Sequence, residues 1–189
     1  MLVNPIHFPC WGLSMSSPVE DVSKLAQTLL EWRKNDRWLL LGRHAAISEK
    51  QLWTAWAGVG GRKSQDTMRS HSLDAEFIRL IAGTHQIRIG FERAGIANGD
   101  NEAWLVYLPE FWTAEINDAK WPEFDLVALD EEADRLMRVL DAKLLTHRPI
   151  PNSETIERLH LELGINEELD DWAAIERAAL SHIALADLA

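Results

Sequence analysis

The uncharged apolar runs in this 189-residue chain are all short. One of them, Trp38-Leu39-Leu40-Leu41, lies between Arg37 and Arg43 and is far below the roughly 20 residues that a membrane helix requires. A short, continuous apolar run with charged flanks predicts a buried strand, here 37–42. We therefore expect a folded core that contains short strands, and no membrane span.

Segments with apolar residues at helical spacing precede and follow this strand in the sequence. The order Ser17-Pro18-Val19-Glu20 is typical of a helix start, and Ser48 caps a second helix that we expect to end at the glycines 58–61. Two further helices should follow, one from Leu73 to the stop at Gly83 and one from Thr84 to Gly95.

Further strands are predicted at 6–15, 103–108 and 125–129. The first should lie at a sheet edge, because Pro5 and Pro9 cannot join a central ladder. Helices are expected at 131–145, from Ser153 onward, and at 171–187. The predicted fold class is α+β. It consists of one domain over residues 1–189, with a small, largely antiparallel or mixed sheet of three to five strands covered by several helices.

The charge is unevenly distributed along the chain. The net charge is −11, yet residues 1–93 hold 12 Lys and Arg against 9 Asp and Glu, while residues 94–189 hold 7 against 21. An acidic total argues against binding to nucleic acid through the protein as a whole. The division fits either two surfaces with different partners or an acidic half that only keeps the protein soluble.

The single cysteine indicates a reducing compartment. Cys10 has no partner for an intrachain disulfide, and the first residues lack the basic and apolar regions of a secretory leader. We expect a cytoplasmic protein.

The sequence contains no convincing catalytic constellation. The segment 57–64 ends in Lys63-Ser64 like a phosphate-binding loop, but Ala57 and Arg62 stand where glycines are required, and a helix precedes it. The seven histidines never show the spacing of a zinc-binding helix, so we expect no metal and no cofactor. Cys10 could be the nucleophile of an unrecognised enzyme, but a small buried thiol is the commoner case.

The segment 72–87, Ser-Leu-Asp-Ala-Glu-Phe-Ile-Arg-Leu-Ile-Ala-Gly-Thr-His-Gln-Ile, resembles the signature of the TPRKB family. In that family a helix ends at a small-residue break, and a Gly-x-Arg-Gln-Ile stretch, an amphipathic helix and a Gly-Ile or Gly-Val stop follow. Five residues match: Gly83, Gln86, Ile87, Gly95 and Ile96. The segments 46–52 and 175–180 also resemble the family, which usually has arginine in place of His85.

This resemblance implies a non-catalytic subunit of the KEOPS complex. Such a subunit binds and stimulates the kinase/ATPase subunit and, in archaeal members, holds the single-stranded 3′ CCA end of tRNA. It thereby supports threonylcarbamoylation of the tRNA adenosine next to the anticodon, with only an indirect link to the transferase subunit.

Several cations and the start of one helix form the predicted nucleic-acid site. Backbone N–H groups at a helix start can bind a phosphate, and flexible cations can neutralise the neighbouring phosphates. The predicted site residues are Arg62, Lys63, Arg69, His71, Gly83, Thr84, His85, Gln86 and Arg88. His85 lacks the permanent charge of the family's arginine. In the alternative interpretation the loop is merely solvated, Thr84 is an ordinary helix cap, and the protein is a kinase-binding adaptor without RNA binding.

The last helix is apolar on almost all sides. Trp172, Ile175, Ala179, Ile183 and Ala186 have the spacing of a stripe that covers the core. Leu180, Leu185 and Leu188 then point away from it, and we expect them to contact the kinase, unless the helix is buried on every side.

Overall fold

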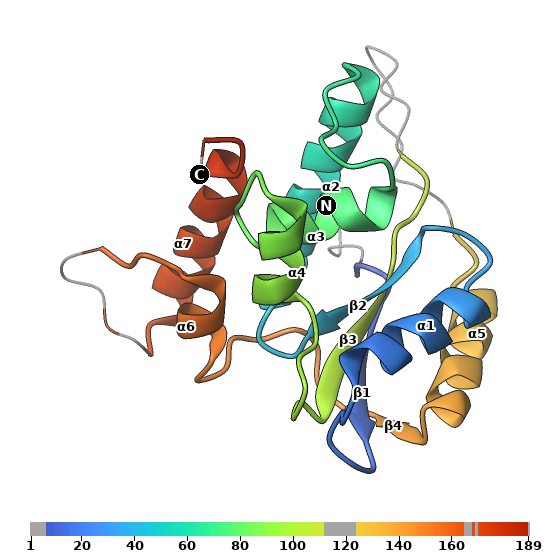
Figure 1. Ribbon diagram of the computed structural model, residues 1–189. Helices are drawn as coiled ribbons and strands as arrows, with labels where there is room; N and C mark the ends of the chain where they lie inside the picture. Colours follow the sequence, from blue (N-terminus) through green and yellow to red (C-terminus); the bar gives the residue numbers. More distant parts are fainter. Residues whose placement is uncertain (1–6, 112–123, 165–167, 169, 189) are drawn as a thin grey trace, which may run out of the picture.

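The computed structural model describes residues 7–111, 124–164, 168 and 170–188. Its described part contains four strands and seven helices, which Figure 1 shows in sequence colours. Their bounds are β1 Cys10–Met15, α1 Val22–Trp32, β2 Trp38–Gly42, α2 Glu49–Ser64, α3 Leu73–Ile81, α4 Ile87–Ala94, β3 Glu102–Tyr107, α5 Leu126–Val139, β4 Ala142–Leu144, α6 Thr155–Leu159 and α7 Trp172–Leu185. No helix in these ranges has the length and apolarity that crossing a membrane requires.

The four strands form one antiparallel sheet in the order β2-β3-β1-β4. In the registers, Gly12 of β1 lies opposite Trp104 of β3, and Leu41 of β2 lies opposite the same tryptophan on its other side. The predicted α+β class with a small antiparallel sheet is confirmed.

Helices cover both faces of the sheet. One face, which includes Leu41 and Trp104, packs against α2, α3 and α7, and the other, which includes Leu40 and Leu105, packs against α1 and α5. Figure 1 shows α1 and α5 together on one side and the remaining helices on the other. Strands buried on both faces need apolar residues at consecutive positions, which explains the uninterrupted run in β2.

The prediction that the first strand lies at an edge is wrong. β1 pairs with β3 on one side and β4 on the other. Pro9 lies just before the strand starts at Cys10, so the proline does not interrupt either ladder. The two edge strands are β2 and the three-residue β4.

The predicted strand at 125–129 is the first turn of α5. Asp125 caps this helix, because its carboxylate accepts a hydrogen bond from Ala128 N at 3.1 Å. Leu126 and Val127 are exposed, whereas Leu129 and Ala133 face the core, as one stripe of a helix does. The helix ends at Val139 rather than at residue 145, since Asp141 turns with a positive φ into β4.

The glycines at 58–61 do not end the second helix. α2 continues through them to Ser64, starting from the expected cap at Ser48. A Cβ on Gly58 would lie 3.1 Å from the Leu80 side chain, and one on Gly60 would lie 2.9 Å from the Phe111 ring. Other parts of the chain therefore approach α2 closely at Gly58 and Gly60, whereas Gly61 has open space around it. The residues that resembled a phosphate-binding loop belong to the helix.

Two other predicted helix starts are displaced by a few residues. α1 is capped by Asp21, whose carboxylate accepts from Ser23 N at 2.9 Å, and not by the hydroxyl at Ser17. α4 begins at Ile87 rather than at Thr84.

Candidate nucleic-acid interface

A tight turn joins α3 to α4 at the segment that resembles the TPRKB signature. Gly83 has a φ of +58°, its N–H donates to Leu80 O at 3.0 Å, and Thr84 N donates to Arg79 O at 3.3 Å. This pair of hydrogen bonds defines a Schellman motif, in which glycine is favoured because a Cβ is strained at positive φ. The predicted stop at Gly83 is confirmed.

The imidazole of His182, from α7, covers this turn. His182 Nε2 donates to Ala82 O at 2.8 Å, and a Cβ on Gly83 would lie 1.9 Å from His182 Cδ2. Burial lowers the pKa of His182 below its ordinary value of 6.5, so the ring is neutral at pH 7. The turn is therefore fixed both by its own backbone and by a helix that lies about 100 residues away in sequence.

The start of α4 is exposed beside this turn. Gln86 is the exposed N-cap residue, and its side chain makes no capping hydrogen bond. Thr84 is buried, and its Oγ1 accepts a hydrogen bond from Gln86 N at 3.2 Å. This bond fixes the backbone that leads into α4. The N–H groups of the first turn have no acceptor in a preceding turn. His85 is exposed next to them.

Lys63, Arg69, His71 and Arg88 of the predicted site are exposed. Lys63 Nζ lies 5.3 Å from the centroid of the Phe111 ring, and Arg69 and His71 are exposed in the loop before α3. Arg88 points outward from α4 and forms an ion pair with Glu92. Gly83 and Thr84 are buried and position the turn rather than contact solvent.

Arg62 differs from these residues, because it is held inside the protein by other groups. Its Nη2 donates to Asp187 Oδ2 at 2.6 Å, and its Nη1 donates to Gly58 O at 3.0 Å. Only 19% of its side chain is exposed. The expectation of a flexible loop cation does not fit Arg62, since α2 extends through this position and directs the side chain inward.

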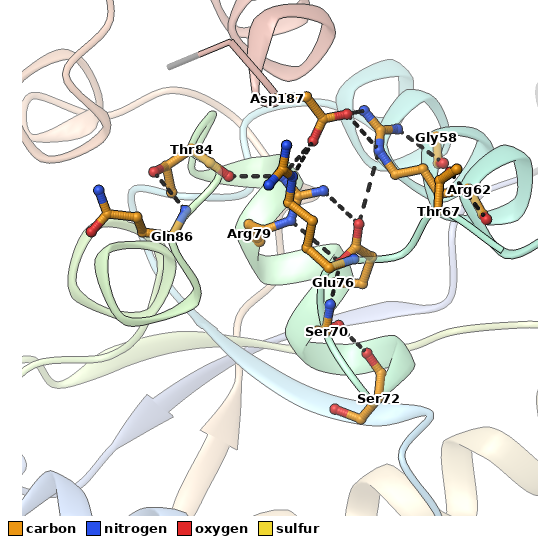
Figure 2. Close-up of polar contacts among 11 residues, drawn as sticks. Gly58, Arg62, Thr67, Ser70, Ser72, Glu76, Arg79, Thr84, Gln86 and Asp187 are labelled. Atoms are coloured by element: carbon orange, nitrogen blue, oxygen red, sulfur yellow. Dashed lines mark hydrogen bonds and ion pairs between the residues drawn. The ribbon is translucent and has the colours of Figure 1, made fainter.

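The centre of this region is a fully buried ion pair between Glu76 and Arg79 of α3. Arg79 Nη2 donates to Glu76 Oε1 at 2.5 Å, and Arg79 Nη1 donates to Thr84 O at 2.9 Å. Glu76 Oε2 also accepts from Ser70 N at 3.0 Å. Burial by itself would raise the pKa of Glu76, but Arg79 and the backbone donors outweigh burial and lower it. Figure 2 shows this pair between the turn and the end of α2.

Asp187, two residues beyond the end of α7, completes the network. Its Oδ1 accepts from Arg79 Nη1 at 2.9 Å, and it also pairs with Arg62 and with Arg69, whose Nε lies 3.4 Å from Oδ1. Partial burial would raise the pKa of Asp187, but the hydrogen bonds and charges of Arg62 and Arg79 outweigh burial and lower it.

Sequence reasoning missed Glu76, Arg79, Asp187 and His182. Glu76 and Arg79 could have been recognised in the sequence, because they form a charged pair at i and i+3 within the apolar helix around Phe77 and Leu80. No local pattern pointed to Asp187, since its partners Arg79 and Arg62 lie 108 and 125 residues away in the sequence.

The last helix presents a mixture of buried and exposed apolar residues. Ile175, Ala179, Ile183 and Ala186 are buried as predicted, but Trp172 is 56% exposed because it occupies the first turn, beyond the edge of the core. Leu185 and Leu188 are exposed, and Leu180 is half-buried. We call Leu180, Leu185 and Leu188 the α7 patch.

Cys10 lies in a position that does not favour nucleophilic chemistry. Cys10 is buried, and burial strongly raises the pKa of its thiol, so the nucleophilic thiolate is disfavoured. Within the residues that the structure describes, no three His, Cys, Asp or Glu side chains are grouped so that they could hold a metal ion.

Neither a protein-family model nor a curated protein matches this sequence at a significant level.

Proposed function

We propose that this protein is a non-catalytic, cytoplasmic subunit of a KEOPS complex. In this role it binds the kinase/ATPase subunit and the single-stranded 3′ CCA end of tRNA. It thereby supports threonylcarbamoylation of the adenosine next to the anticodon and contacts the transferase subunit only indirectly.

The proposal rests chiefly on the turn at Gly83. The residues that resemble the TPRKB signature have a physical task in this chain: Gly83 has positive φ beneath His182, and Gln86 starts the exposed end of α4. Gly95 also lacks room for a side chain, because a Cβ would lie 2.4 Å from Phe91 O. Two glycines of the signature therefore have a structural role in this chain.

The chemistry around this turn suits a single-stranded RNA end. A phosphate can accept hydrogen bonds from the first N–H groups of α4, and the Gln86 amide can bond a base edge. Lys63, Arg69 and Arg88 are long, exposed cations, and flexible cations of this kind can neutralise the phosphates of a bound strand. His85 can stack on a base.

The α7 patch supports the second half of the proposal, which is contact with the kinase. Leu185 and Leu188 are 54% and 84% exposed, and neighbouring apolar side chains exposed in this way favour a protein partner.

A kinase-binding adaptor without RNA binding is the second candidate. The ion pairs of Arg62 and Arg69 with Asp187 favour it, because they reduce the positive charge available to RNA in a protein whose net charge is already −11. The two candidates share the α7 patch and differ only in RNA binding.

Titration of labelled tRNA at several salt concentrations distinguishes them. Lys63→Ala and Arg88→Ala should each weaken binding. Each should also make the slope of log binding constant against log salt concentration shallower by about one unit for each lost phosphate contact. Lys143→Ala is the matched control, because Lys143 is exposed on the edge strand β4. If the parent protein captures the kinase but binds no tRNA, the adaptor function is correct.

A further inference from the structure

Three arginine side chains converge on the carboxylate of Asp187. Arg62 approaches Oδ2 through Nε at 3.0 Å and Nη2 at 2.6 Å, while Arg79 Nη1 lies 2.9 Å and Arg69 Nε 3.4 Å from Oδ1. These donors come from α2, from the loop before α3 and from α3 itself. Such a convergence of guanidinium groups on one anion is the geometry by which proteins bind phosphate.

The position of Asp187 allows this carboxylate to be replaced. Arg79 is fully buried, whereas the side chains of Asp187 and Arg69 are 39% and 49% exposed, so the carboxylate lies at the mouth of the cluster. The backbone at Asp187 lies beyond the last helical residue, Leu185, and is not part of a strand or helix. A turn of the Asp187 side chain toward solvent would leave the three arginine side chains open to another anion.

The charge of the cluster favours an anion at this position. Arg62, Arg69 and Arg79 contribute three positive charges, and Glu76 and Asp187 contribute two negative ones. Without Asp187 the excess is two positive charges. Arg79 keeps its bonds to Glu76 and to Thr84 O, so the buried part of the network does not depend on Asp187.

The cluster adjoins the turn that leads to α4. The same Arg79 nitrogen that donates to Asp187 also donates to Thr84 O, one residue beyond Gly83. Figure 2 shows Thr84 and Gln86 on one side of Arg79 and Asp187 with Arg62 on the other. An anion bound in place of Asp187 would therefore share the Arg79 guanidinium with the turn that precedes α4.

We propose that Arg62, Arg69 and Arg79 form a phosphate site, which the Asp187 carboxylate occupies in the free protein and a phosphate of single-stranded nucleic acid takes over on binding. The proposal rests on the proposed RNA-binding function, to which it adds a specific phosphate contact and a competitor within the chain. RNA binding is then opposed by the protein's own carboxylate.

The Asp187→Asn variant tests this. Its amide has nearly the shape of the carboxylate but no charge, so the variant should bind both inorganic phosphate and a short single-stranded RNA ending in CCA roughly tenfold more tightly than the parent. Asp134→Asn, on the exposed surface of α5, is the control for the change in net charge. Adding Arg69→Gln to Asp187→Asn should remove most of the gain. Thermal melting of each variant shows that it is folded.

Measuring both inorganic phosphate and RNA distinguishes failure of the phosphate-site proposal from failure of the proposed RNA-binding function. An Asp187→Asn variant that is folded but binds phosphate no more tightly than the parent, or no more tightly than Asp134→Asn, overturns the proposal. A gain for phosphate without RNA binding by any variant rejects nucleic acid as the source of the phosphate, and with it the proposed RNA-binding function. If the parent binds RNA and the variant gains nothing for either ligand, the proposed function stands and the role of Asp187 is rejected.

Discussion

The His182 imidazole lies so close to Gly83 that no side chain fits between them: a Cβ at Gly83 would be 1.9 Å from His182 Cδ2 and 2.2 Å from Nε2. This contact links α7 to the turn between α3 and α4. The helix that bears the α7 patch and the turn proposed to bind RNA are therefore parts of one packed unit.

Gly83→Ala should lower the stability of the protein by at least about 2 kcal/mol, because alanine is strained at positive φ and its methyl group would displace His182. Thermal melting measures the change. Gly61→Ala is the control, since a Cβ there meets nothing within 4 Å and helix propensity favours alanine by about 0.5–1 kcal/mol. Equal melting temperatures for the two variants would contradict the account of the turn.

The buried Glu76–Arg79 pair should be much more important for stability than an exposed pair. Arg79→Met removes the closest cation from the buried Glu76 carboxylate and should cost about 3–5 kcal/mol. Arg88→Met removes the exposed pair with Glu92 and should cost less than about 1 kcal/mol. Denaturant unfolding provides both values, and a small effect at Arg79 would show that the network is not essential.

Some of the fold follows directly from local sequence. The strands around Leu40 and Leu105 are continuous apolar runs, and the stop at Gly83 is a glycine followed by a new helical stripe. The strand predicted at 125–129 failed because the first turn of an amphipathic helix can be as apolar as a strand. The helix break predicted at the glycines 58–61 failed because a glycine favoured by close packing, such as Gly60 beside Phe111, looks the same in sequence as one that ends a helix.

The site was less predictable for a different physical reason. The exposed cations Lys63 and Arg88 could be identified as candidates because they lie near the signature segment in the sequence. Whether a cation is available depends on its long-range partners, and Arg62 meets Asp187 only after α2 and α7 have packed together. Local patterns contain no information about such contacts.

Stability should fall as the pH decreases below 6.5. Burial lowers the pKa values of His44 and His182, so the folded protein keeps both rings neutral while the unfolded chain takes up protons near the ordinary pKa of 6.5. The stabilisation is fully present above pH 6.5 and is lost as the pH falls through the lower, folded-state values. Denaturant unfolding at a series of pH values measures the free energy of unfolding. Its decrease with falling pH should be smaller for His182→Asn than for the parent. If the variant and the parent show the same pH dependence of stability, His182 does not contribute to it.

The α7 patch should bind the kinase without contributing to the core. Leu185→Glu places a charge on a side chain that is 54% exposed, so the melting temperature should change little while capture of the kinase subunit is lost. Leu126→Glu, on α5 with 51% exposure, is the matched control and should bind the kinase normally. A collapse in melting temperature for Leu185→Glu, or normal capture, would contradict the assignment of the interface.

The most direct test of the proposed function compares intact tRNA with tRNA that lacks its terminal CCA. Fluorescence anisotropy at moderate salt should show binding of the intact tRNA, and removal of the CCA end should weaken it by roughly tenfold or more, since each stacked base contributes about 1–3 kcal/mol. Equal affinities for the two tRNAs, or no binding of either, would contradict the proposal that the surface around Gly83 and α4 holds the 3′ end.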